Sequence, residues 1–209
     1  RGKFLDGQTD DFEVVKKKAE IENPWFTQES IDEAIEGIKL WLTKSELETW
    51  IENYDIKDKK SKRVGLILAG NIPLVGFHDI LVCYVSGNIS VIRFSEKDQV
   101  LIKYLLNELI NAFPNADAYF DFDENFKTID TLIATGSDST ANLFQRYFSQ
   151  IPSLIRCHRN AVAVLHGNEN DEELLALGKD AFSYFGLGCR NISKLFVPQG
   201  YTFDHLLGL

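Results

Sequence analysis

The feature that most constrains the fold is a regular alternation of short apolar runs with helix-like stretches after residue 63. The apolar runs cover residues 64–69, 89–94, 129–134, 161–165 and 192–197. The helix-like stretches between them cover residues 73–85, 96–113, 139–148 and 171–185. Continuous apolar runs of this length are typical of buried parallel strands. The alternation therefore predicts an α/β fold with a doubly wound, mostly parallel sheet of the Rossmann type.

The first 60 residues are polar and acidic, with helical periodicity. Residues 27–30 can begin one helix, and Ser45 with Glu48 has the spacing of a capping box before another. We expect a helical segment over residues 1–60 and a dinucleotide-binding domain over residues 61–160. The beginning of a second, catalytic α/β domain is expected over residues 161–209.

Composition excludes several classes of protein. A net charge of −9 and a pI of about 5.0 disfavour non-specific binding to nucleic acid, although a local basic pocket remains possible. Three irregularly spaced cysteines fit a reducing cytoplasm rather than a disulfide framework. No apolar run approaches the roughly 18 residues of a membrane span. No spacing of His, Cys and carboxylates predicts a metal site. We therefore expect a cytoplasmic protein without nucleic-acid or membrane partners.

Three loops are expected to share one crevice: residues 70–73, 93–96 and 134–140. Each follows a predicted strand, and ligands of parallel sheets bind at the carboxyl ends of strands. The helix start at Ser137 can face a phosphate or be an ordinary N-cap. Arg93 can contact an adenosine ribose or its 2′-phosphate, or form a surface ion pair with Glu96 or Asp98. The candidate cofactor-binding residues are Asn71, Pro73, Arg93, Ser95, Glu96, Thr135, Gly136 and Ser137.

Cys189 is the candidate nucleophile. Gly186 and Gly188 allow a tight turn from which the thiol can project while the Cys189 backbone N–H remains available to an oxyanion. The alternative is a small buried apolar residue. Cys83, on an apolar helix face, is expected to be in the core.

Four segments carry a resemblance to known families. Residues 87–96, G-N-I-S-V-I-R-F-S-E, resemble the G-N-x-x-V-x-K-P-S-E segment of the aldehyde dehydrogenase superfamily, and residues 134–137, A-T-G-S, resemble its F-T-G-S turn. Residues 69–79, A-G-N-I-P-L-V-G-F-H-D, and residues 185–191, F-G-L-G-C-R-N, resemble the long-chain acyl-CoA reductases that supply fatty aldehyde to bacterial luciferase. The resemblance covers about residues 64–205.

This resemblance implies an aldehyde dehydrogenase-like fold and NADPH-dependent reduction of a fatty acyl-CoA to the aldehyde. Cys189 would hold the acyl group as a thioester, and the nicotinamide would deliver hydride to it. Arg93 favours the 2′-phosphate of NADPH, whereas Glu96 would favour NADH; the family favours NADPH. The expected partners are a fatty acyl-CoA substrate, further copies of the full-length chain and an acyl-transfer enzyme.

Departures from the family pattern are also informative. Hydrolytic members carry a glutamate base in an E-L-G-G-K segment, but residues 151–165 contain no Asp or Glu, so deacylation by water should be slow. His158 lies in that slot and is the candidate acid/base, with a surface histidine among arginines as the alternative. Phe94 replaces the family's proline. An asparagine donor to the oxyanion has no clear equivalent after Pro73.

Other functions stay open at this point. The chain could be a non-catalytic nucleotide- or acyl-binding subunit, a thiol acyltransferase without cofactor, or a CoA-independent aldehyde dehydrogenase. It contains no methionine and ends without a closing element, so we expect a complete protein to continue beyond residue 209.

Overall fold

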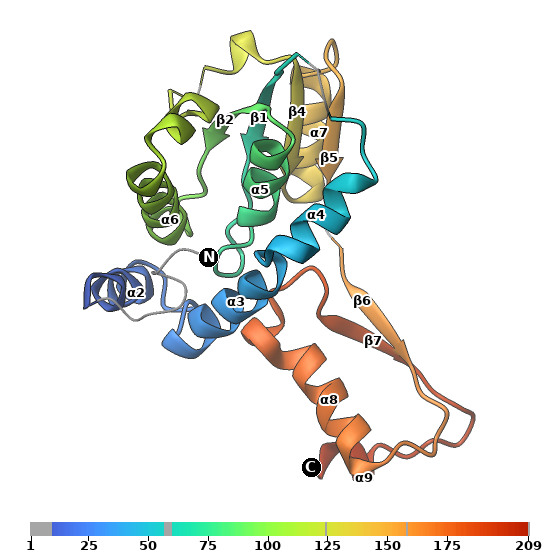
Figure 1. Cartoon of the computed structure of the whole chain (residues 1–209). Helices are drawn as coiled ribbons and strands as arrows, with labels where there is room; N and C mark the ends of the chain where they lie inside the picture. Colours follow the sequence, from blue (N-terminus) through green and yellow to red (C-terminus); the bar gives the residue numbers. More distant parts are fainter. Residues whose placement is uncertain (1–9, 57–59, 124, 158, 209) are drawn as a thin grey trace. The chain divides into compact units, whose positions relative to one another are not determined.

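A computed structural model describes residues 10–56, 60–123, 125–157 and 159–208 (Figure 1). The chain divides into two compact units, residues 1–157 and residues 158–209. No helix in the described ranges is both long enough and apolar enough to cross a bilayer.

A five-stranded sheet forms the centre of the first unit, with strand order β3-β2-β1-β4-β5 (Figure 1). The strands are β1 (Arg63–Ile67), β2 (Ile89–Arg93), β3 (Phe120–Asp121), β4 (Thr131–Thr135) and β5 (Ser153–Arg156). All four pairings are parallel, and Gly65 of β1 pairs with Val91 of β2 and Leu132 of β4. The predicted parallel sheet is thus confirmed.

Helices cover both faces of this sheet, as a doubly wound fold requires. Helices α5 (Phe77–Val85) and α6 (Gln99–Ala112) pack on one face, where Leu66 and Ile92 are fully buried. Helix α7 (Asp138–Tyr147) packs on the other face, beside Leu132. Each such side chain contributes about 1.5–3 kcal/mol through burial. The alternation of strand side chains between two cores fixes the register of the sheet.

Two helices begin later than the sequence predicts. Helix α5 begins at Phe77 rather than Pro73, because Leu74 has a left-handed φ of 57° that no helix accommodates. Helix α6 begins at Gln99, and Asp98 rather than Ser95 precedes its first turn. The Ser95 hydroxyl instead accepts a hydrogen bond from the Lys97 N–H at 3.3 Å.

Between residues 10 and 56, the described N-terminal part of the first unit forms three helices: α2 (Asp10–Glu22), α3 (Gln28–Trp41) and α4 (Lys44–Glu52). Thr27 caps α3 through the Ser30 N–H, as expected, and Phe12 of α2 stacks on Tyr104 of α6 at 5.1 Å. The predicted capping box at Ser45 is wrong: Thr43 caps α4 by accepting from the Glu46 N–H. Short 3₁₀ helices η1 (Pro114–Tyr119) and η2 (Phe126–Thr128) flank β3.

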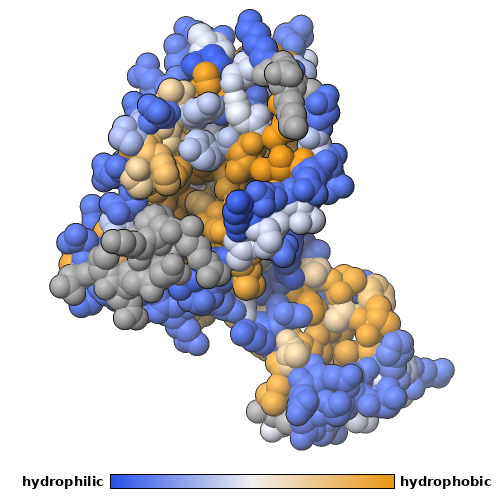
Figure 2. All heavy atoms as spheres, viewed as in Figure 1, coloured by the Kyte–Doolittle hydropathy of each residue, from blue (hydrophilic) through white to orange (hydrophobic). Residues whose placement is uncertain are grey.

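The second unit is a single β-α-β element. Parallel strands β6 (Ala161–Val164) and β7 (Ile192–Phe196) are joined through α8 (Asp171–Phe182) and η3 (Ser183–Gly186), and α9 (Asp204–Leu207) follows. A capping box of Asn170 and Glu173 begins α8. Several apolar side chains of β6, β7 and α8 are exposed, and Figure 2 shows the hydrophobic surface of this unit.

Candidate functional site

The first unit has a topological switch point between β1 and β4. From β1 the chain continues to β2 on one side, whereas β4 and β5 extend the sheet on the other side. Parallel sheets bind ligands outside the carboxyl ends of strands at such a point. The loops after β1, β2 and β4, which hold the predicted cofactor residues, begin at this edge of the sheet.

The loops after β1 and β2 approach each other closely. A Cβ atom on Gly70 would lie 2.6 Å from the Ser95 Cβ and would overlap the Ser95 hydroxyl, so the approach requires glycine. The Leu68 N–H donates to the Arg93 carbonyl at 3.1 Å. Asn71 is half-buried, whereas Pro73 is buried and does not present its ring to solvent. Glu96 is exposed beside them.

Asp98 is buried next to the loop that follows β1. Its exposed fraction is 4%, and neither carboxyl oxygen has a hydrogen-bond partner among the residues described. Burial raises the pKa of the Asp98 carboxyl well above its usual range, and the nearby backbone N–H groups of Leu74 and Val75 offset only part of this effect. The Asp98 carboxyl is therefore protonated more readily than an exposed one.

The turn after β4 begins α7. The Gly136 N–H donates to the Arg156 carbonyl at 3.1 Å, and the Ser137 hydroxyl accepts from the Thr140 N–H at 3.3 Å. Ser137 therefore acts as an ordinary N-cap, as the sequence allowed. Thr135 and Gly136 are half-buried, and Ser137 is exposed. Binding of phosphate at this turn stays a prediction.

A groove of about 680 Å³ lies on the α7 face of the sheet. Half of its described lining is aromatic or cationic, namely Arg93, Phe126, Lys127, Phe144, Tyr147 and Phe148, and the other half is aliphatic or amide side chains. Arg93 is at the end of β2, Phe126 and Lys127 are on η2, and Phe144 and Tyr147 are on α7. Among the described lining residues, Arg93 is the single member of the predicted cofactor set. The sequence did not point to the others because they come from three separate segments.

An ion pair that the sequence did not reveal joins α5 to β5. One guanidinium nitrogen of Arg156, Nη1, donates to both carboxylate oxygens of Asp79 at 2.7 and 2.8 Å. Burial alone would raise the pKa of Asp79, but hydrogen bonds from His78 and Arg156 outweigh it and the pKa lies below its usual value. The stretch without acidic residues thus receives a carboxylate from α5, although Arg156 occupies that carboxylate.

Histidines and cysteines of the first unit lie in different environments. The His78 ring packs edge-on against Trp41 at 5.6 Å between centroids, and its Nδ1 lies 3.7 Å from Asp79 Oδ1. Cys83 is in the core, as predicted, and burial raises the pKa of its thiol to about 12. Cys157, after β5, is exposed. The candidate acid/base His158 lies outside the described residues.

Cys189 lies in a turn between η3 and β7 and is exposed, so its thiol is not a core residue of the second unit. The turn is closed by a hydrogen bond of 3.1 Å from the Asn191 N–H to the Gly188 carbonyl. Among the described residues, the Cys189 N–H has no acceptor. The thiol and this amide therefore have the freedom that a nucleophile with an oxyanion donor needs.

Asn191 fixes this turn from within. It is 9% exposed; its Oδ1 accepts from the Gly188 N–H at 2.6 Å, and its Nδ2 donates to the carbonyls of Asp180 and Ser183 at 2.8 and 3.1 Å. The side chain thus ties the Cys189 turn to the end of α8. Buried amides with several partners usually specify local structure.

The segment before the turn is held in an unusual conformation. Tyr184, Phe185 and Gly186 follow one another with φ values of 52°, 58° and 71°. Non-glycine residues in this left-handed region cost about 1–3 kcal/mol each. Such strain persists where the surrounding structure fixes the backbone, which is common near functional sites.

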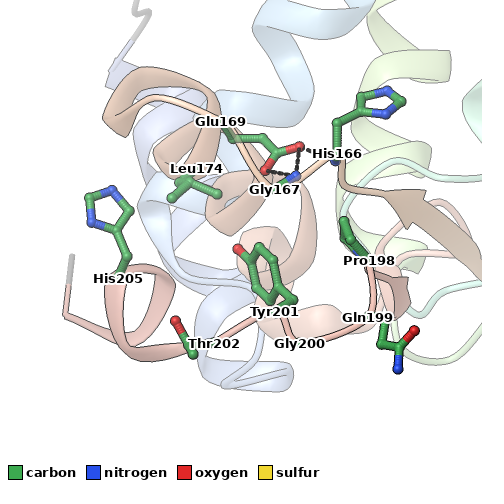
Figure 3. Close-up of a pocket in the computed structure, with 10 residues that line it drawn as sticks. All are labelled: His166, Gly167, Glu169, Leu174, Pro198, Gln199, Gly200, Tyr201, Thr202 and His205. Atoms are coloured by element: carbon green, nitrogen blue, oxygen red, sulfur yellow. Dashed lines mark hydrogen bonds between the residues drawn. The ribbon is translucent and has the colours of Figure 1, made fainter.

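A second groove, of about 430 Å³, belongs to the second unit (Figure 3). Glu169 there accepts hydrogen bonds from the His166 and Gly167 N–H groups, which lowers the pKa of its carboxyl. Its described lining does not include Cys189. In the part of the chain that the structure describes, no group of three His, Cys, Asp or Glu side chains could hold a metal ion.

No protein-family model and no curated protein matches the chain. Solved structures do match it. A protein assigned as the aldehyde dehydrogenase PutA from Anabaena variabilis matches with a TM-score of 0.71 and 18% identity, over 95% of this chain and 48% of that one. Glyceraldehyde-3-phosphate dehydrogenase GapN from Methanocaldococcus jannaschii, complexed with NADP, matches with a TM-score of 0.61 and 15% identity, over 94% and 50%. Substrate-bound AldH from Staphylococcus aureus matches with a TM-score of 0.62 and 16% identity, over 96% and 50%.

These matches show the fold. The chain has an aldehyde dehydrogenase-like α/β fold with a parallel sheet, which confirms the predicted fold class. It spans about half the length of these solved proteins. The activity, substrates and partners of the whole protein are therefore matters for proposal.

Proposed function

We propose that this chain carries the cofactor-binding residues and the nucleophile of an NADPH-dependent reductase that converts a fatty acyl-CoA to the aldehyde. More broadly, it is an oxidoreductase acting at the aldehyde level. The observation that carries the proposal is the exposed Cys189 thiol, on a turn fixed by Asn191, with an amide N–H free of acceptors among the described residues. The aldehyde dehydrogenase-like fold supports it.

Cys189 performs the covalent step. Its thiolate sulfur attacks the acyl-CoA carbonyl carbon, a C–S bond forms, and the bond to the CoA sulfur breaks as CoA leaves as a thiolate. The product is an S-acyl group on Cys189. The Cys189 N–H stabilises the negative charge on the carbonyl oxygen during this exchange. Exchange of the CoA thioester for the Cys189 thioester is nearly isoenergetic, so the acyl group stays reactive.

The first unit supplies the residues for a dinucleotide. GapN is complexed with NADP, and an aldehyde dehydrogenase from Mycobacterium tuberculosis is complexed with NAD⁺. Here the switch-point loops and the aromatic groove that includes Arg93 fit an adenosine and its phosphates. When bound, the dinucleotide supplies hydride to the acyl carbon. The Cys189 sulfur then leaves as a thiolate with release of the aldehyde.

The lack of acidic residues in residues 151–165 favours exchange over hydrolysis. Hydrolysis of a thioester is accelerated by a general base that takes a proton from water, which is a glutamate in the hydrolytic members of the family. Within the first unit, Arg156 of this stretch binds both carboxylate oxygens of Asp79, so this carboxylate is already paired. This supports reduction of an acyl-CoA rather than oxidation of an aldehyde to a free acid.

Labelling of the thiol tests the proposal. The chain is incubated with palmitoyl-CoA without nucleotide, and intact-mass and peptide mass spectrometry locate the acyl group. We expect one hydroxylamine-labile acyl group on Cys189, lost in Cys189→Ser and retained in Cys157→Ser, since Cys157 is also exposed. Equal labelling of both cysteines, or none on Cys189, would contradict the proposal.

Product analysis separates the competing functions. A CoA-independent aldehyde dehydrogenase would release free acid from an aldehyde and NADP⁺, whereas the reductase consumes NADPH when acyl-CoA is added. A non-catalytic binding subunit would do neither and would leave Cys189 unmodified. The expected homo-oligomer of the full-length protein and the acyl-transfer partner enzyme remain part of the proposal. Sedimentation and co-purification of the full-length protein address them.

A further inference from the structure

The aromatic groove of the first unit is lined by two cations from different segments. Arg93 is at the end of β2, and Lys127 is in the middle of η2. Among its described lining residues there is no Asp or Glu. Glu96, whose negative charge would repel a 2′-phosphate, is not among them. The two charged side chains among the described lining residues are thus both cationic.

The backbone that carries Lys127 is anchored at both sides. The Asn125 side chain accepts from the Lys127 N–H at 3.2 Å and caps η2. Phe126 packs over Gly65 of β1, where an added Cβ would come within 2.9 Å of its ring, and its ring lies 6.1 Å from that of Phe148. Lys127 itself is exposed. Its position at the groove is thus set by neighbours rather than by its own packing.

Aromatic walls with adjacent cations suit one class of ligand. Flat aromatic faces accept a purine ring by stacking, and guanidinium and ammonium groups bind phosphate through charge-assisted hydrogen bonds. An adenosine that carries a phosphate on its ribose combines both features. Unphosphorylated adenosine would use the aromatic walls and leave the ammonium group of Lys127 without a ligand.

We propose that Lys127 is a specificity-determining residue, which together with Arg93 selects a dinucleotide with a 2′-phosphate on its adenosine ribose. This inference rests on the proposed function, because it assigns the adenosine of the cofactor to the aromatic groove. It resolves the conflict between Arg93 and Glu96 in favour of NADPH. Arg93 was visible in the sequence, whereas Lys127 joins the lining of the same groove only through the fold.

Equilibrium binding to the full chain tests the assignment without turnover. Isothermal titration compares adenosine 2′,5′-bisphosphate, adenosine 3′,5′-bisphosphate and 5′-AMP. We expect the 2′,5′ compound to bind most tightly, and Lys127→Gln to weaken it about tenfold while leaving 5′-AMP within twofold. Lys127→Arg should retain the preference. Lys44→Gln, the same change on the exposed surface of α4, should leave all three affinities unchanged.

Four results would overturn the assignment. These are equal weakening of 5′-AMP by Lys127→Gln, the same weakening by Lys44→Gln, no binding of any of the three nucleotides, and equal or tighter binding of the 3′,5′ compound. The last would assign the groove to the adenosine of CoA instead. None of these results affects acylation of Cys189, which is measured without nucleotide. Failure of this inference is thus distinct from failure of the proposed function.

Discussion

Arg156 Nη1 lies 2.7 and 2.8 Å from the two carboxylate oxygens of Asp79, a residue 77 positions earlier in the chain. The Asp79 side chain is 8% exposed and that of Arg156 is 28% exposed, so the charges are largely removed from water. The pair fastens the first turn of α5 to the end of β5, beside the turn that begins α7. It is a structural tie that leaves both oxygens of the Asp79 carboxylate hydrogen-bonded.

Breaking this pair should destabilise the first unit. Asp79→Asn or Arg156→Gln is expected to lower the free energy of unfolding at pH 7 by about 2–4 kcal/mol, because each leaves a partner buried without its counter-charge. The double variant should lose less than the sum of the two. Urea unfolding measures this. Glu22→Gln, which removes an exposed ion pair with Lys18 at 3.8 Å, is the control and should cost under about 1 kcal/mol.

The same pair predicts the direction of the acid response. Since the folded pKa of Asp79 is below its unfolded value, the unfolded state binds protons first, and stability falls as pH drops below about 4. Asp121, whose pKa is lowered by the Asp123 N–H and by Arg63, contributes in the same direction. Asp79→Asn should therefore make the fall in the free energy of unfolding at low pH, the acid limb of the profile, less steep. An unchanged limb would contradict the linkage assigned to Asp79.

Asp98 predicts the opposite response. Its folded pKa is raised by burial, so the unfolded state loses a proton that the folded state keeps, and stability falls as pH rises above about 4. Asp98→Asn cannot ionise and should be more stable than the wild type at pH 7, by about 1–3 kcal/mol. Unfolding curves between pH 4.5 and 8 measure this, with the exposed Asp117→Asn as control. Parallel pH profiles for Asp98→Asn and the wild type would refute it.

Asn191 should control the order of the Cys189 turn. Asn191→Ala removes one acceptor and two donor interactions, each worth about 1 kcal/mol, and should expose the Gly188 amide to solvent. Hydrogen exchange followed by mass spectrometry should show faster exchange in residues 183–192. Arg190→Ala, an exposed neighbour in the same turn, should leave exchange there unchanged. Equal rates in the two variants would show that Asn191 does not fix the turn.

The close approach of Gly70 to Ser95 makes a sharp steric prediction. Gly70→Ala places a Cβ 2.6 Å from the Ser95 Cβ and should cost about 1–3 kcal/mol through overpacking. Ser95→Gly in the same chain should recover most of the loss. Gly37→Ala in α3, where an added Cβ meets nothing within 4 Å, is the matched control and should stabilise the chain slightly. Thermal unfolding compares them, and a neutral Gly70→Ala would refute the contact.

The sequence was informative where burial on both sides of a strand leaves a continuous apolar run, as in residues 64–69 and 129–134. It did not reveal β3 and β5, because β3 has two residues and β5 keeps Ser153 and Leu154 exposed. Two helix starts were misplaced because the local backbone differs from what the pattern predicts. The left-handed Leu74 delays α5, and Ser95 makes a local bond to Lys97 instead of capping α6.

The candidate site shows the same division. Glycines around Cys189 predicted an exposed turn, because they act locally through backbone freedom. The hydrogen bonds between Asp79 and Arg156, and the presence of Arg93 and Lys127 in one groove, depend on the tertiary fold, which single-residue patterns do not encode. Asn191 has no local sequence signal beyond its place in the family motif, although its amide holds the turn.

Burial of Cys83 gives the protein a built-in reporter. A thiol with a pKa of about 12 has almost no thiolate at pH 8, so iodoacetamide should modify Cys157 and Cys189 in the native protein and spare Cys83. Modification of Cys83 would then measure the fraction of molecules whose first unit has unfolded. Pulsed alkylation read by mass spectrometry should therefore follow the unfolding of that unit in mixtures, lysates included, without a fluorescent label.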